Sequence, residues 1–217
     1  MQRNEIFRDT KNWYLTQKNV VTSGLIDFAA QNAGKKILDI GCATGDYCIA
    51  LTEREFECTG VDINPQYIEE ARKKNVNALV SESDFLNFED NSFDTALLFE
   101  VLEHVENPYN LLKEAKRVAK KNVLITVPNC SQLSQLGQFN LTYEHILEED
   151  HVNFFTKKDL EDMISGVFDN FNVKEGDLMR LGAIGLPFPL KLVILGLYRI
   201  KLIKFDISYR LYVVAEV

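Results

Sequence analysis

Paired cysteines, basic residues and long apolar runs are all scarce in this 217-residue sequence, and each shortage excludes a class of protein. The four cysteines, Cys42, Cys48, Cys58 and Cys130, never stand in a Cys-x-x-Cys spacing, which argues against a zinc knuckle or a disulfide framework and predicts reduced thiols. No stretch approaches the ~18 uncharged apolar residues of a transmembrane helix. The first residues lack the apolar core of a signal peptide, so we expect a cytoplasmic protein.

Basic residues are outnumbered by acidic ones, 24 to 32, which gives a net charge of −8 and a pI near 5.0. This charge opposes non-specific attraction to nucleic acid or to an anionic membrane, so no nucleic-acid partner is favoured. The segment 181–205 is a local exception, because it holds four basic residues and no acid. A peripheral membrane contact through 190–204 therefore stays open, beside a lid over a ligand pocket or a subunit contact.

The apolar runs alternate with helix-like segments, as in a parallel sheet with crossover helices. Polar caps followed by proline at Asn64-Pro65 and Asn107-Pro108, and Thr156 before an apolar stripe, predict helix starts. The runs that predict strands are 36–40, 58–61, 78–81, 93–99, 122–127, 171–174 and 207–214. We therefore predict the α/β class, with a doubly wound, mostly parallel seven-stranded sheet, helices on both faces and an insertion before the last strand.

The length favours one domain over residues 1–217. We divide it into an N-terminal helical cover (1–34), a core (35–175), an insertion or lid (181–205) and a last strand (206–217). Monomer and homodimer both stay open.

A glycine-containing turn, Asp39–Gly45, follows the first expected strand, and Asp62 ends the second strand 23 positions after Asp39. Glycines let a ligand approach the backbone, and an acid at about this distance can accept both hydroxyls of a ribose. The third and sixth positions of a dinucleotide fingerprint hold Ala43 and Asp46 instead of glycine, which makes a nucleotide-dependent oxidoreductase unfavourable. Asp39 and Asp46 would repel a pyrophosphate but suit a ligand that carries an ammonium and a sulfonium.

The ordered set of motifs over about residues 35–165 resembles the class I S-adenosylmethionine-dependent methyltransferases, in the group similar to ubiquinone-biosynthesis O-methyltransferases. The motifs are ILDIGCATG (37–45), GVDI (60–63), Asp84-Phe85, Phe93-Asp94, EVLEHV (100–105) and LITVPN (124–129). The resemblance implies a Rossmann-like fold and S-adenosylmethionine as the methyl donor. It also implies the residues that contact this donor, namely Asp39, Gly41, Cys42, Gly45, Asp62, Ile63, Asp84, Phe85, Phe99 and Glu100.

In this pattern Asp62 would hold the ribose, Ile63 would pack on the adenine and Asp84 would accept from the adenine amino group. Ala43 stands where the family more often has glycine.

Glu100, Glu103 and His104 are spaced so that one helical turn would bring all three to the mouth of the site. We favour His104 as the general base, with Glu103 as its partner, acting on a hydroxyl acceptor. Two other interpretations stay open: structural packing, and a divalent metal site completed by a distant histidine, either His145 or His151. Metal is therefore a possible but not a favoured cofactor.

The segment after the fifth strand resembles the part of the family that closes on the acceptor, which makes Tyr143 and His151 candidate substrate contacts. The preferred function is methyl transfer to an oxygen of a small-molecule, sugar or lipid-like acceptor. The alternatives are a non-catalytic S-adenosylmethionine-binding module and a metal-dependent RNA 2'-O-methyltransferase.

Overall fold

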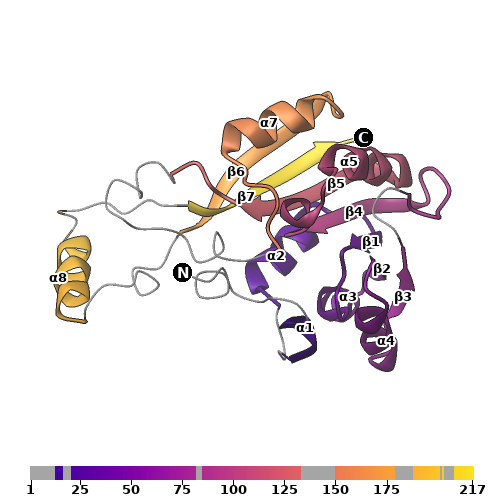
Figure 1. Ribbon diagram of the computed structural model, residues 1–217, viewed down its shortest axis with the longest axis horizontal. Coiled ribbons are helices and arrows are strands. Elements are labelled where there is room, and N and C mark those ends of the chain that lie inside the picture. Colours follow the sequence, from indigo (N-terminus) through magenta and orange to yellow (C-terminus); the bar gives the residue numbers. More distant parts are fainter. Residues whose placement is uncertain are drawn as a thin grey trace, which may run out of the picture.

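The computed structural model describes residues 13–16, 21–81, 85–132, 150–178, 188–200, 202 and 208–217. Its centre is a seven-stranded sheet in the order β3-β2-β1-β4-β5-β7-β6 (Figure 1). The strands are β1 (Lys36–Ile40), β2 (Glu57–Asp62), β3 (Asn77–Val80), β4 (Phe93–Phe99), β5 (Ala119–Pro128), β6 (Asn170–Leu178) and β7 (Ser208–Glu216).

The first five strands are parallel to their neighbours, whereas β7 is antiparallel to both β5 and β6. The carboxyl ends of β1 to β5 therefore meet at one edge of the sheet, which is where ligands bind in open α/β sheets. The middle strands β1, β4 and β5 are nearly continuous apolar runs, because helices cover both of their faces. The expected mostly parallel, doubly wound sheet is confirmed.

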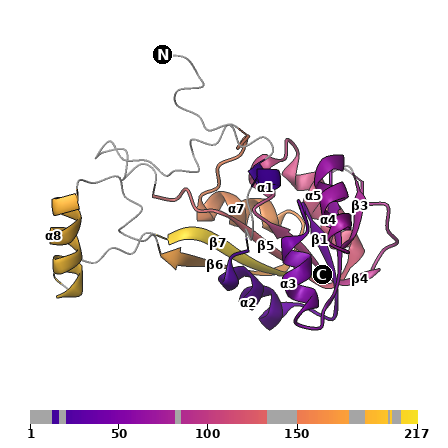
Figure 2. The same ribbon diagram turned by 90° about the horizontal axis from the view of Figure 1, so that it is seen from below.

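Helices cover both faces of the sheet (Figures 1 and 2). α2 and α3 pack with α4 on one face, and α5 and α7 pack on the other. The helices are α1 (Trp13–Thr16), α2 (Ser23–Asn32), α3 (Asp46–Thr52), α4 (Pro65–Lys73), α5 (Pro108–Val118), α7 (Lys157–Ser165) and α8 (Phe188–Arg199), with a 3₁₀ turn, η2, at Leu102–His104.

The helix starts follow the expected capping chemistry. The Asn64 side chain accepts a hydrogen bond from the Gln66 N–H at 3.0 Å, and Pro65 occupies the first turn. Thr156 forms a capping box with Asp159, because each side chain accepts from the other residue's backbone N–H. These caps fix where each helix leaves the sheet and thus the shape of the edge above the strand ends.

The strand ends differ in detail from the expectations. β5 begins at Ala119 instead of Asn122, because an irregularity with one extra residue on β5 lets the pairing with β4 extend to the Phe93–Ala119 pair. β6 is also longer than the predicted 171–174, since it pairs with β7 along most of its length. The insertion before β7 contains α8, which lies apart from the sheet in both views (Figures 1 and 2).

Candidate functional site

The turn after β1 is built around two glycines in left-handed conformations, Gly41 at φ +77° and Gly45 at φ +78°. A Cβ on Gly41 would lie 2.6 Å from Val101 Cγ2, so only glycine fits there. Ala43, at φ +44°, is also left-handed, which is uncommon for a residue with a side chain. The Gly41 and Cys42 N–H groups donate to Val61 O at 2.8 and 2.9 Å, so β2 holds the turn in place.

Asp62, at the end of β2, braces the same turn from the other side. One of its carboxylate oxygens accepts from the Ala43 N–H at 2.9 Å and the other from the Asn64 N–H at 2.8 Å. Burial raises the pKa of Asp62, while these backbone N–H groups oppose the rise. Each oxygen keeps a further lone pair that a ribose hydroxyl can use. The sequence predicted the ligand role of Asp62 and missed its bracing role.

A pocket opens beside the turn, and it brings together several residues that the sequence singled out. Its lining is Tyr14, Asp39, Gly41, Cys42, Ala43, Asp46, Tyr47 and Phe99. Asp39 is 3% exposed, and burial raises its pKa to about 7. Asp46 is held at the pocket wall by Lys74 and by the Thr44 hydroxyl, each at 2.8 Å. The lining therefore combines acidic side chains, Asp39 and Asp46, with aromatic ones, Tyr14, Tyr47 and Phe99.

Tyr14, from α1, links this pocket to the next part of the site. Burial raises the pKa of its phenol, and the negative charge of Glu100 raises it further. Its ring also meets that of Tyr67 on α4, with centroids 5.8 Å apart. Tyr14 falls in the expected N-terminal helical cover (1–34), and no motif in the sequence marked it as a pocket residue.

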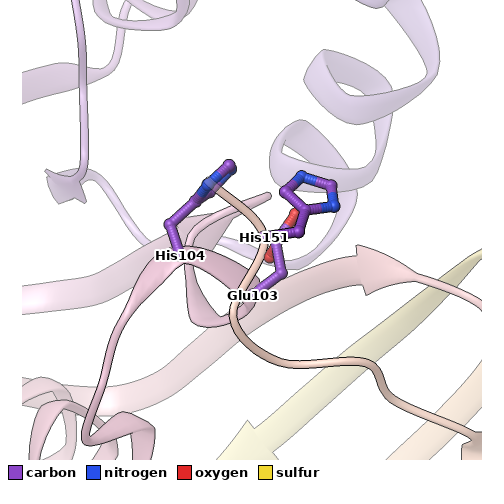
Figure 3. A group of neighbouring side chains, drawn as sticks. All are labelled: Glu103, His104 and His151. Atoms are coloured by element: carbon purple, nitrogen blue, oxygen red, sulfur yellow. The ribbon is translucent and has the colours of Figure 1, made fainter. Parts of the chain in front are cut away.

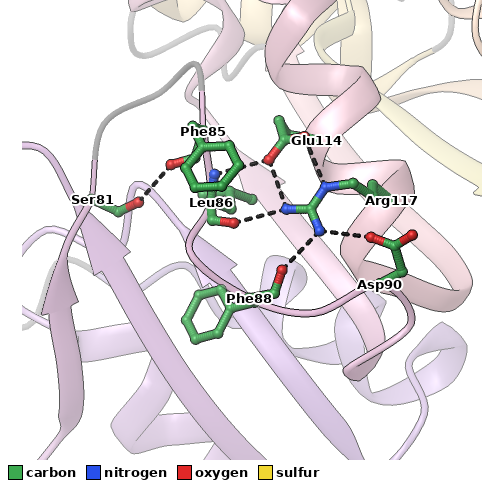
Figure 4. A network of polar contacts seen from close by, with 7 residues as sticks. All are labelled: Ser81, Phe85, Leu86, Phe88, Asp90, Glu114 and Arg117. Carbon is green, nitrogen blue, oxygen red and sulfur yellow. Dashed lines mark hydrogen bonds and ion pairs between the residues drawn. The ribbon is translucent and has the colours of Figure 1, made fainter.

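Two apolar side chains that the resemblance assigns to the adenine are exposed, Ile63 at 67% and Phe85 at 63%. The segment that carries Phe85 is fixed by Arg117 of α5 (Figure 4). Arg117 donates to Leu86 O and to Phe88 O at 2.7 Å each, and its guanidinium lies 5.8 Å from the Phe85 ring.

Glu114, which pairs with Arg117 at 2.8 Å, also accepts from the Leu86 N–H at 2.9 Å. The sequence missed both anchors. The predicted adenine contact Asp84 lies outside the described residues.

Glu103, His104 and His151 come together at the end of β4 (Figure 3). One side-chain donor atom of each lies within 4.8 Å of the others, and the two imidazole rings are 4.6 Å apart. Glu103 is buried, and the His104 Nδ1 lies 3.3 Å from Asp150 O. The expected pairing of Glu103 with His104 thus gains His151, which stands 47 positions later in the chain.

Backbone hydrogen bonds bring His151 to this place. The N–H groups of Val152 and Asn153 donate to Glu103 O at 2.8 and 3.0 Å. The Asn153 side chain donates to Leu102 O at 2.9 Å and to Val105 O at 2.6 Å. These four bonds fasten the segment before α7 to η2.

Glu100 differs from the expectation that it would point with Glu103 and His104. Its side chain accepts from Arg210 Nε at 2.9 Å, and Arg210 also pairs with Asp177 of β6. The backbone explains this direction, because Glu100 adopts a left-handed conformation with φ +54° and ends β4 before η2 begins. Glu100 therefore ties the end of β4 to the β6–β7 hairpin.

The three clustered side chains fit a divalent metal as well as they fit acid–base chemistry. Two imidazoles and one carboxylate are a common donor set for transition metals, with further positions open to an acceptor or water. Glu103, His104 and His151 would hold such an ion, and Glu100 is not part of the group among the described residues. The predicted acceptor contact Tyr143 and the alternative ligand His145 lie outside the described residues.

Comparison with known proteins agrees with this geometry. A family model described as a methyltransferase domain matches residues 14–167. The chain is 30% identical over 131 residues to an uncharacterised protein of Methanocaldococcus jannaschii, which covers 58% of the chain and 60% of that protein. It is 35% identical over 107 residues to a demethylmenaquinone methyltransferase of Staphylococcus aureus, covering 46% of the chain and 44% of that enzyme. The chain thus spans about half the length of the curated relatives it matches.

A solved structure of a SAM-dependent methyltransferase from Archaeoglobus fulgidus has the same fold. It superimposes with a TM-score of 0.69 at 19% identity, over 95% of this chain and 97% of that one.

Proposed function

This chain belongs to the methyltransferase domain family, and we propose that it transfers the methyl group of S-adenosylmethionine to an oxygen atom of a small-molecule, sugar or lipid-like acceptor. One observation carries the proposal. Phe99 lines the acidic pocket after β1 and stands three positions before η2, which carries Glu103 and His104, and Val101 between them lies against Gly41 of the turn. A donor site and a proton-accepting group side by side are what methyl transfer to a hydroxyl requires.

The donor side of the pocket suits a cationic methionine part. Asp39 and Asp46 supply negative charge near the turn, and a desolvated carboxylate attracts an ammonium more strongly than an exposed one does. Asp62 would accept from the ribose hydroxyls, and the exposed side chains Ile63 and Phe85 would cover the adenine faces. Phe99 would lie beside the reacting methyl group.

The acceptor would enter beside His104, and the chemistry is a single displacement. The acceptor oxygen forms a bond to the methyl carbon while the bond from that carbon to sulfur breaks and its electron pair stays on sulfur. His104 or His151 takes the hydroxyl proton, and the buried Glu103 favours the protonated imidazole. Positioning of oxygen, carbon and sulfur in line supplies the rest of the rate.

A divalent cation on the same three residues is a second route, favoured by their close grouping. When bound there, the ion would lower the pKa of the acceptor hydroxyl. Glu103, His104 and His151 would then act as ligands, and proton transfer to solvent would replace the role of the imidazole base.

Calorimetric titration with S-adenosylmethionine and S-adenosylhomocysteine tests the donor site directly. We expect micromolar binding to both, and a folded protein that binds neither would refute the proposal. Addition and chelation of divalent metal then separate the two routes, because only the metal route loses turnover with a chelator.

Turnover of a panel of hydroxyl acceptors tests the catalytic role. We expect His104→Gln and Glu103→Gln to lower the rate by about 10²-fold or more, in the range for a lost general base, with donor affinity retained. Glu161→Gln, a change at a half-buried position of α7, is the matched control and should keep full activity. A non-catalytic binding module predicts donor binding with no turnover in any of these proteins.

A further inference from the structure

Three of the four cysteines lie close together beside the turn that follows β1. Cys42 belongs to that turn, Cys48 to α3 and Cys58 to β2, and they pack in one cluster with apolar side chains of α4. All three are free thiols, and the Sγ atoms of Cys48 and Cys58 are 2.7 Å apart. Because a disulfide bond is about 2.05 Å long, an approach of roughly 0.7 Å would bring these two sulfur atoms to bonding distance.

Gly60 leaves the space in which the sulfur atoms lie. It stands two positions after Cys58 on β2, so both residues face the same side of the sheet. A Cβ atom at Gly60 would lie 2.6 Å from the Cys42 Sγ and 3.4 Å from the Cys48 Sγ. The parallel pairing of β2 with β1 places Gly60 beside Asp39. The sheet and α3 therefore fix how close the thiols lie to one another and to this carboxyl group.

The three thiols differ in how far a reagent can reach them. Cys42 and Cys48 are buried, at 4% and 1% exposed, whereas Cys58 is half-buried. The hydrogen bond between Cys58 and Cys48, and then burial, raises the pKa of the Cys48 thiol well above its ordinary value. The same hydrogen bond lowers the pKa of Cys58, although burial and the charge of Asp39 outweigh this effect and leave the pKa raised. Cys58 is therefore the thiol of the pair that an oxidant meets first.

Cys48 connects the thiol pair to the pocket after β1. Its thiol donates to the Asp39 Oδ2 with a sulfur–oxygen distance of 3.6 Å, and this hydrogen bond lowers the pKa of the buried carboxyl group. A disulfide sulfur carries no hydrogen, so oxidation of Cys48 would remove the hydrogen bond. Asp39 would then keep its proton to a higher pH, and its attraction for a cationic ligand would weaken.

From this geometry we propose that Cys48 and Cys58 form a site of reversible oxidation, at which a low-molecular-weight disulfide converts the two thiols to an intrachain disulfide bond that weakens the binding of S-adenosylmethionine. The Cys58 thiolate attacks the reagent, forms a mixed disulfide and releases one reagent thiol. The Cys48 thiolate then attacks the Cys58 sulfur, closes the protein disulfide and releases the second reagent thiol. Two electrons pass from the protein to the reagent, and the protons of the two protein thiols end on the two released thiols.

A thiol reductant reverses this step. Where thiols are otherwise kept reduced, bonds of this kind are transient and serve in redox sensing. The effect on S-adenosylmethionine rests on the proposed function, whereas the formation of the bond does not.

Treatment of the full chain with 2-hydroxyethyl disulfide tests the bond. The reaction is run at about pH 8, where a larger fraction of the thiols is ionised, and is followed by denaturation and alkylation of the remaining thiols. We expect two of the four cysteines to be alkylated instead of all four. Digestion after Lys and Arg and before Asp puts Cys42, Cys48 and Cys58 in separate peptides, 39–45, 46–54 and 55–61. Mass spectrometry should find 46–54 joined to 55–61.

Calorimetric titration then compares the reduced and oxidised proteins. We expect S-adenosylmethionine to bind the oxidised protein about three- to tenfold more weakly, and dithiothreitol to restore the affinity. Cys58→Ser cannot form the bond and should bind equally well before and after treatment. Cys130→Ala, which removes a buried thiol outside the cluster, is the matched control and should respond as the unaltered protein does.

Four alkylated cysteines after treatment, a reagent that stays attached to Cys58, or a bond that includes Cys42 would overturn the proposal. So would a bond between Cys48 and Cys58 that leaves the affinity unchanged. If the reduced protein binds no S-adenosylmethionine, the proposed function fails, and the peptide masses still decide whether the two thiols form a bond. Thermal melting of the oxidised protein confirms that weaker binding does not come from unfolding.

Discussion

Asp39 gives the sharpest test of the proposed donor pocket, because its carboxyl group is buried at the turn that follows β1. Burial raises its pKa from 3.8 to about 7, and the hydrogen bond from the Cys48 thiol, with a sulfur–oxygen distance of 3.6 Å, only partly opposes this rise. The folded protein therefore keeps a proton on Asp39 over a pH range in which the unfolded chain has lost it. In that range, between about pH 4 and pH 7, the free energy of unfolding falls as pH rises, and it levels off above pH 7.

The Asp39→Asn variant removes this dependence, because an amide does not titrate in the range. The interval from 3.8 to about 7 corresponds to a few kcal/mol at most, at roughly 1.4 kcal/mol for each pH unit. For a chain of this length, 1 kcal/mol shifts the melting temperature by roughly 2 to 4 °C. We expect the melting temperature of the variant, relative to the unaltered protein, to rise by about 5 to 10 °C between pH 5 and pH 8.

Thermal melts of both proteins at several pH values measure this difference, in which the titration of all other groups largely cancels. Asp27→Asn, an exposed change on α2, is the control and should show no such trend. A difference between Asp39→Asn and the unaltered protein that stays constant from pH 5 to pH 8 would refute the argument. The same argument predicts that affinity for the cationic donor rises with pH through 7 and that this rise is smaller in Asp39→Asn.

Three further substitutions address the residues that shape the proposed donor site. Gly45→Ala should lower stability by about 1 to 3 kcal/mol, because φ is +78° and the new Cβ would lie 2.9 Å from Val76 Cγ2; chemical denaturation measures this loss. Asp62→Asn replaces one carboxylate oxygen by an NH₂ group, so the N–H of Ala43 or of Asn64 loses its acceptor. Calorimetry should then give an affinity for S-adenosylmethionine that is lower by about tenfold or more. Arg117→Met removes the donors to the carbonyls of Leu86 and Phe88, and hydrogen exchange at the Leu86 N–H should become about tenfold faster.

Each of these changes has a matched control elsewhere in the chain. Gly196→Ala places a Cβ in open space on α8 and should not lower stability. Asp27→Asn, again on the surface of α2, should leave donor affinity unchanged. Arg54→Met removes an exposed ion pair, which contributes little. Losses in the controls that match those in the test variants would show that the contacts at the site are not the cause.

The grouping of Asp39, Gly41 and Asp62, the residues of the proposed donor site, could be predicted from the sequence because they lie at or just after strand ends. Asp39, Gly41 and Asp62 sit at the ends of β1 and β2, and parallel pairing brings those ends together whatever the rest of the chain does. Two local patterns, a glycine turn and an acid at the end of an apolar run, are therefore enough to predict that these residues lie close together. The fold class could be predicted for the same reason, from alternating apolar runs.

The acceptor side depends on contacts that local patterns do not encode. His151 reaches His104 through the hydrogen bonds of Val152 and Asn153, which join segments far apart in the sequence. The direction of Glu100 depends on Arg210, 110 positions away. Helical spacing alone wrongly grouped Glu100 with Glu103, because the chain ends β4 with a left-handed residue instead of continuing as a helix.

The four hydrogen bonds that fasten Val152 and Asn153 to η2 also bear on how such a protein can change its specificity. The proposed donor site rests on paired strands, whereas the segment of His151 is attached to the sheet by a small patch of backbone carbonyls, those of Leu102, Glu103 and Val105. As long as Asn153 is kept, the neighbouring positions can vary without loss of this attachment. A library randomised at Val152 and Phe154, both exposed, would therefore sample new acceptors on an unchanged cofactor platform.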